Sequence, residues 1–170
     1  NGPVGPLAVA RAILALEGAH TTNLRVQLSE NYFAGDLVLH AGDWIDTGID
    51  VPKRSRLPLG LPMRITPRGV KAGISCALCH ATVDPLTGLV VEGAPNADLN
   101  AGLLLALASN SAAYLPHTGI DSLDQFPDDS PRYITGDLNQ RIALPAVNRL
   151  EAAVDADLVR WPPGYFDSTI

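Results

Sequence analysis

The stretch Cys76-Ala77-Leu78-Cys79-His80 decides how the rest of the chain is interpreted. Its pattern, C-x-x-C-H, places two thiols three residues apart and an imidazole directly after the second thiol. Two thiols at this spacing can each add to one vinyl group of a haem, and the adjacent imidazole can then bind the iron as an axial ligand. The pattern therefore predicts one covalently attached haem c, held by Cys76 and Cys79 with His80 on the iron.

Three other roles fit the two cysteines less well. A thioredoxin-like redox motif should lie next to a βαβ pattern, which the sequence lacks. A structural zinc site needs four ligands, usually from two paired motifs, and the chain has only these 2 cysteines. A structural disulfide between cysteines three apart is sterically poor and would leave His80 without a role. Haem attachment is therefore the favoured interpretation.

The residues after the motif extend this interpretation. Gly93-Ala94-Pro95-Asn96 is followed by Leu99 and Gly102, and this segment resembles the G-x-P-N segment and leucine-containing helix of the cytochrome c family. The resemblance implies that the Pro95 carbonyl accepts a hydrogen bond from Nδ1–H of His80, which would fix the orientation of the ligating ring. The chain departs from the family in its long segment before the motif and in having no methionine after it.

The sixth iron ligand separates electron carriers from haem enzymes, because an open position admits peroxide, oxygen or nitric oxide. In the cytochrome c family the distal ligand lies in the loop between the middle and C-terminal helices, and His117 occupies the corresponding loop here. The resemblance therefore implies that His80 and His117 both bind the iron. The alternatives left open are His20, His40, Met63, a ligand from outside the chain, and an open site.

Hydrophobic periodicity predicts a mainly α fold, a cytochrome c-like helical haem domain with an irregular, partly β N-terminal extension. Apolar residues recur at helical spacing in four segments, and proline stands at or near the start of three of them. The expected helices cover residues 6–18, 66–78, 99–115 and 145–158. Alternating apolar residues at 24–28 and a short run at 37–40 predict strands, a short apolar run at 89–91 predicts an extended segment, and prolines at 52–62 predict an irregular connector.

Three parts of the chain follow from these elements, and we expect them to form a single compact unit. Residues 1–66 are expected to form an N-terminal helix and an irregular arm, which either covers apolar surface or contacts another subunit. Residues 67–160 are the expected haem domain. Residues 161–170 are an apolar tail whose three aromatic residues are typical of a protein interface.

Composition limits the partners. The 170 residues carry a formal net charge of −6, which disfavours a nucleic-acid partner and is compatible with a basic protein partner. No apolar run approaches the length of a transmembrane segment. The chain begins at Asn1 with no recognisable signal peptide, so we expect a processed product or a fragment. Attachment of haem c outside the cytoplasmic membrane, implied by the resemblance, predicts a periplasmic or extracellular location.

The function predicted from these observations is a mono-haem c-type cytochrome that carries single electrons between redox protein partners. Enzyme activity is the less favoured expectation, because the sequence has no Ser-His-Asp order and no phosphate-binding loop. Two alternatives stay open. One is a peroxidase-like haem enzyme or ligand-binding module with an open sixth position, for which Glu92 or His117 would have to act as the distal acid–base residue. The other is a subunit of a homo-oligomer or of a multi-haem electron-conducting assembly.

Overall fold

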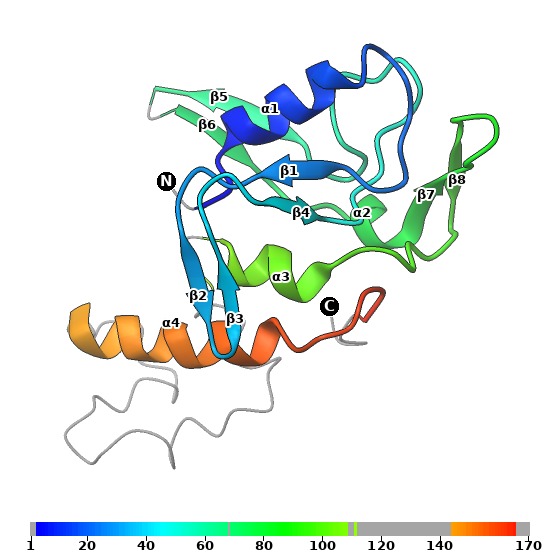
Figure 1. The fold of residues 1–170 in the computed structure, drawn as a ribbon. Helices are drawn as coiled ribbons and strands as arrows, with labels where there is room; N and C mark the ends of the chain where they lie inside the picture. Colours follow the sequence, from blue (N-terminus) through cyan, green and yellow to red (C-terminus); the bar gives the residue numbers. More distant parts are fainter. Residues whose placement is uncertain (1–2, 68, 109–110, 112–143, 166–170) are drawn as a thin grey trace.

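A computed structural model describes residues 3–67, 69–108, 111 and 144–165. Within these ranges the chain forms four α-helices and eight short β-strands (Figure 1). The helices are α1 (Pro6–Ala15), α2 (Ala77–His80), α3 (Ala101–Ala106) and α4 (Leu144–Leu158). The strands are β1 (Arg25–Gln27), β2 (Tyr32–Ala34), β3 (Leu37–Leu39), β4 (Trp44–Asp46), β5 (Met63–Thr66), β6 (Gly69–Ala72), β7 (Ala81–Val83) and β8 (Val90–Glu92).

The described strands pair as four separate two-stranded antiparallel sheets. Three of them are hairpins of consecutive strands, β2–β3, β5–β6 and β7–β8, while β1 pairs with β4 across the β2–β3 hairpin. The fold is therefore mixed α/β, and the prediction of a mainly α fold is wrong. The short strands β5, β6 and β7 around the pentapeptide account for much of the difference, since the sequence predicted extended segments only at 24–28, 37–40 and 89–91.

The helix expected over residues 66–78 is wrong for a local reason. Thr66 pairs with Gly69 in the β5–β6 hairpin, so Pro67 lies in a hairpin connection and not at the first position of a helix. The N–H of Gly73 donates to the carbonyl of Pro62, 2.9 Å away across the hairpin, instead of to a residue one helical turn earlier. Glycine is a poor helix former, and Gly69 and Gly73 both favour the extended alternative.

The first and last expected helices are confirmed. α1 begins at Pro6, where the missing N–H of proline is not needed by the helix. α4 covers the expected C-terminal segment. α3 begins after Asn100, whose side chain accepts a hydrogen bond from the N–H of Leu103. The helix expected at 99–115 is shorter than predicted, because α3 begins at Ala101 and ends at Ala106 with Leu107 as its C-cap; residues 109–110 and 112–115 lie outside the described residues.

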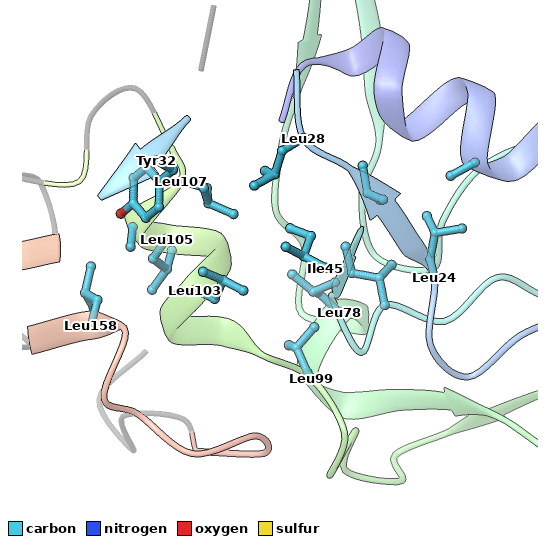
Figure 2. Packing of buried hydrophobic residues seen from close by; sticks show 14 of the residues in the cluster. Leu24, Leu28, Tyr32, Ile45, Leu78, Leu99, Leu103, Leu105, Leu107 and Leu158 are labelled. Carbon is cyan, nitrogen blue, oxygen red and sulfur yellow. The ribbon is translucent and has the colours of Figure 1, made fainter. Parts of the chain in front are cut away.

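One hydrophobic cluster holds these elements together (Figure 2). It joins residues from the first 51 positions, such as Leu24 and Ile45, with residues of α3, α4 and the pentapeptide. In Figure 2 the side chain of Leu78 lies next to Ile45 and Leu99. Gly102 permits α3 to approach α4, because a Cβ at this position would lie 2.0 Å from the carbonyl oxygen of Leu158.

The start of the C-terminal tail packs on this core. The N–H of Gly164 donates to the carbonyl of Leu99 over 2.8 Å, and the rings of Trp161 and Tyr165 meet edge to face with centroids 5.0 Å apart. Phe166 lies outside the described residues, and the role of the tail as an interface stays a prediction. No helix in the described ranges has the length and apolar character needed to cross a membrane.

Candidate functional site

A single short helical turn, α2, carries the pentapeptide. The carbonyl of Cys76 accepts hydrogen bonds from the N–H groups of Cys79, at 3.3 Å, and His80, at 2.9 Å. Residues spaced by three and four share one side of a helix, so Cys76, Cys79 and His80 lie on one side and Leu78 does not. Leu78 is buried, whereas Cys76 and His80 are exposed and Cys79 is half-buried. The turn therefore exposes the Cys76 thiol and the imidazole, while Cys79 is partly buried and packs against the core.

The backbone of the loop before β5 packs directly against this turn. Gly60 has φ +75°, and a Cβ at Gly60 would lie 2.1 Å from the backbone nitrogen of Leu78. Both the N–H and the hydroxyl of Ser75 donate to the Gly60 carbonyl, over 3.0 and 3.2 Å. Residues 58–62, predicted only as an irregular connector, thus determine where the pentapeptide lies.

The segment 93–96 binds the other end of the turn. The carbonyl of Cys79 accepts from the N–H of Asn96, and the carbonyl of His80 accepts from the N–H of Gly93, each over 2.9 Å. Asn96 is buried, and its side-chain amide donates to the Gly48 carbonyl over 2.9 Å. The structure thus brings this segment against the pentapeptide. The bond predicted between the His80 ring and the Pro95 carbonyl stays a prediction.

A buried carboxylate holds β7, the strand that directly follows His80. Asp50 is 1% exposed, and its Oδ2 accepts hydrogen bonds from the hydroxyl of Thr82, at 2.7 Å, and from the N–H of Val83. Its Oδ1 has no partner in the described part of the chain. Burial raises the pKa of Asp50, the two hydrogen bonds lower it, and the nearby charge of Asp98 raises it, with a net upward shift.

Sequence reasoning missed Asp50 and Gly60. The available signal for Asp50 was a lone acidic residue between Ile49 and Val51, which are both buried apolar side chains. The signal for Gly60 was a glycine among three prolines, which indicates a turn but not its partner.

The two cysteines are free, with Cys76 exposed and Cys79 half-buried. Burial raises the pKa of the Cys79 thiol, and the charge of Cys76 raises it further. The thiolate is the attacking species in thiol chemistry, so a raised pKa keeps Cys79 in the less reactive, protonated state of a free thiol.

The candidate distal ligands occupy separate parts of the molecule. The Nε2 of His20 lies 3.0 Å from the Pro85 carbonyl, in the turn of the β7–β8 hairpin. The Nδ1 of His40 lies 3.7 Å from the carboxylate of Asp43, just after β3. Met63 is the first residue of β5. His117, the preferred candidate, falls outside the described residues.

The cavity next to the turn limits the size of a group that could bind inside the protein. Behind Leu78 lies an apolar cavity of about 170 Å³, lined by residues that include Leu61, Ile74 and Leu104. Small-molecule pockets usually measure about 300–1,000 Å³, so this cavity is too small for a prosthetic group of the size of haem. In the described ranges no three His, Cys, Asp or Glu side chains are arranged to hold a metal ion, and the zinc alternative therefore has no site there.

Comparisons with known proteins found no match to a family model, a curated protein or a solved structure. No histidine-bearing haem-binding site appears in the described part of the chain. Together these findings overturn the assignment to the cytochrome c family, which rested on the pentapeptide and on the segment 93–102. A five-residue pattern and a short turn recur easily, and they do not by themselves establish a family.

Proposed function

We propose that this chain attaches one haem covalently through Cys76 and Cys79, with His80 as an axial ligand, and carries single electrons between redox proteins. The observation that carries the proposal is the orientation of α2. Its Cys76 thiol and its imidazole are exposed and its Cys79 thiol is half-buried, while Leu78 is buried in the core. A flat prosthetic group could attach to Cys76 and His80 from outside, and its bond to Cys79 would lie at the edge of the core.

The donor set fits this chemistry. Each thiol adds across one vinyl group, so that a carbon–sulfur bond forms and the thiol hydrogen moves to the second vinyl carbon without any oxidant. The haem would supply the iron that changes charge by one electron. Among the three residues, only His80 would bind the iron.

Exposed apolar side chains occur on segments next to the pentapeptide in the sequence or paired with them. Ile74, two residues before Cys76, is 58% exposed, and Val90 and Val91 of β8, the partner of β7, are each 42% exposed. Both faces of a haem are apolar, and such side chains could pack on it.

Hydrogen bonds fix the backbone at His80 and in the strand that follows it. Its carbonyl is bound by Gly93, and the next strand is held by Asp50. A backbone fixed on this side would keep the imidazole in place while the iron changes charge. We further propose that His117 is the sixth ligand and that the protein works in the periplasm or outside the cell.

The experiment is expression of the whole chain in a bacterium with haem-attachment machinery, followed by denaturing electrophoresis and haem staining. We expect the band to keep its haem stain, and a Cys76→Ser/Cys79→Ser variant to lose it. An unstained native band, or a stained double variant, would contradict covalent attachment.

Spectroscopy of the same protein tests the ligand and the function class. A His117→Ala variant should change the iron from low spin to high spin and should bind carbon monoxide. If the native protein already binds carbon monoxide rapidly, the site is open and the enzyme alternative replaces the electron carrier.

A further inference from the structure

The apolar cavity next to Leu78 has no part in the proposed function. Side chains from separate elements line it, among them Val9 of α1, Val26 of β1, Leu78 of α2 and Leu104 of α3. Its volume is about 170 Å³. A dry cavity of about 150 Å³ with apolar walls is large enough to bind benzene or xenon. A space too small for haem is therefore large enough for one small molecule.

The walls of the cavity select against charge. Ten of its eleven lining residues are apolar, and none of the eleven is charged. The exception is Thr47, whose hydroxyl donates to the carbonyl of Leu24 over 2.6 Å and accepts from the N–H of Ile49 over 3.1 Å. The hydroxyl hydrogen is thus already used within the protein. A charged ligand would lose its hydration in this cavity without gaining a partner of opposite charge.

Water is a weak competitor for the same space. A buried water molecule is held by two to four hydrogen bonds to polar groups. Among the lining side chains only Thr47 carries a polar atom, and its hydroxyl already makes two hydrogen bonds. An apolar molecule that enters the cavity therefore displaces little bound water and gains contacts with the walls.

The cavity is accessible from the surface. Val26 and Ile49 line its inner part, and they are 0% and 2% exposed. Two other lining residues, Ile74 and Ala108, are exposed. A small molecule can therefore enter between them without unfolding of the core.

We propose that this cavity binds one small, uncharged, apolar molecule, an aromatic ring or short alkyl chain of about the size of benzene. The volume sets the size of the ligand, and the side chains set its chemistry. Because Leu78 lines the cavity, the bound molecule would contact α2 from the core side. The proposal does not depend on haem, since neither Cys76 nor His80 lines the cavity.

The test is titration of the full-length chain with benzene, followed by nuclear magnetic resonance of ¹³C-labelled Val, Leu and Ile methyl groups. We expect saturable shifts at the lining methyls, including those of Val26, Ile49 and Leu78, and none at the exposed Val38 on β3. Benzoate, which adds a carboxylate to the same ring, should shift none of the lining methyls at the same concentration.

A pair of variants ties binding to this cavity. Val9→Phe adds a ring to a lining position and should weaken benzene binding by about tenfold or more, because the ring takes up the space. Val38→Phe makes the same change at a position that is 51% exposed and does not line the cavity. It should bind benzene like the native chain.

A second pair keeps the test decisive if Val9→Phe does not fold. Leu104→Ala widens the cavity, and it should bind ethylbenzene about tenfold more tightly than benzene, because two more carbons are buried. Leu14→Ala, at a position that is 75% exposed, should keep the native ratio of the two affinities.

Three results would overturn the proposal. The first is a set of benzene shifts that does not saturate or that is spread over the surface. The second is equal benzene affinity in folded Val9→Phe and Val38→Phe, or, where Val9→Phe does not fold, an equal ratio of affinities in Leu104→Ala and Leu14→Ala. The third is a set of nuclear Overhauser contacts, without benzene, between the lining methyls and a side chain that already fills the cavity.

Discussion

The two hairpins on either side of the pentapeptide differ in how they join the protein. The β7–β8 hairpin begins directly after His80, and the outer residues of β7, Ala81 and Val83, are 4% and 1% exposed. The β5–β6 hairpin ends just before the pentapeptide, and Ile65 on β5 is 88% exposed. The strand that directly follows the motif, β7, is therefore mostly buried, whereas β8 and the hairpin before the motif lie on the surface.

The two sides differ in how firmly the backbone is held. On the β7 side, the buried Asp50 and the hydrogen bonds from Asn96 and Gly93 hold the backbone around His80, as the proposed role of His80 would require. On the β5–β6 side, Arg64 and Lys71, which are direct partners across the hairpin, are exposed. If the packing differs in this way, substitutions on the β7 side and in α2 should lower the stability more than substitutions in the β5–β6 hairpin.

The largest difference in the free energy of unfolding is expected between the Leu78→Ala and Ile65→Ala variants. Leu78→Ala empties a buried site in the core and should lower the free energy of unfolding by about 3 kcal/mol. Ile65→Ala removes an exposed side chain and should change it by at most about 0.5 kcal/mol. Urea denaturation monitored by circular dichroism gives both values. Similar losses in the two variants would show that β5–β6 is as well packed as α2.

A pair of glycine variants tests the close backbone contact between Gly60 and Leu78. Gly60→Ala combines a positive φ with a Cβ only 2.1 Å from the nitrogen of Leu78, and should destabilise the protein by about 2 kcal/mol or more. Gly42→Ala is the control, because its φ is also positive, +94°, but its Cβ would meet nothing within 4 Å. It should cost about 1 kcal/mol. Thermal unfolding of both variants measures the difference, and equal losses would reject close packing at Gly60.

The pH dependence of stability tests the buried carboxylate. The pKa of Asp50 is raised above its ordinary value of 3.8, so the folded state holds a proton that the unfolded state has already released. Stability should therefore fall as pH rises from 3.8 through the folded-state pKa. Asp50→Asn should reduce this decline, and the remainder should come from Asp155, whose pKa burial also raises.

The matched control is Asp36→Asn, at an exposed position of the β2–β3 turn. Denaturation midpoints measured from pH 3 to pH 7 should show the native slope in this variant. A native slope in Asp50→Asn would mean that another group causes the decline.

The smallest effect concerns the repulsion across β5–β6. Lys71→Glu places opposite charges on partner positions and should stabilise the chain by about 0.5 kcal/mol. Urea denaturation measures the change. A variant that is destabilised would show that Lys71 contributes to the fold.

The sequence allowed prediction where the signal is local. Pro6 and Pro145 mark helix starts that precede regular apolar repeats, and both helices are confirmed. The spacing of Val70, Ile74 and Leu78 fits a helix, but pairing with β5, more distant in the chain, gives a hairpin instead.

The rest of the site depends on distant contacts. The bonds of Asp50 reach residues 32 and 33 positions away, and the backbone of Gly60 meets Leu78. No periodic pattern encodes such pairs. The pentapeptide could be found because its residues are adjacent in the sequence. Which of its side chains are exposed could not be predicted, because that depends on the burial of Leu78 in a core shared with residues such as Ile45.

The most direct test of the central claim is mass spectrometry of tryptic peptides from the denatured protein, after expression with haem-attachment machinery. Trypsin cuts after Lys71 and next after Arg132, so one peptide, 72–132, contains both cysteines and His80. We predict that this peptide carries the added mass of one haem. A peptide with the unmodified mass, or a mass lower by two hydrogens because a disulfide has formed, would contradict the proposal.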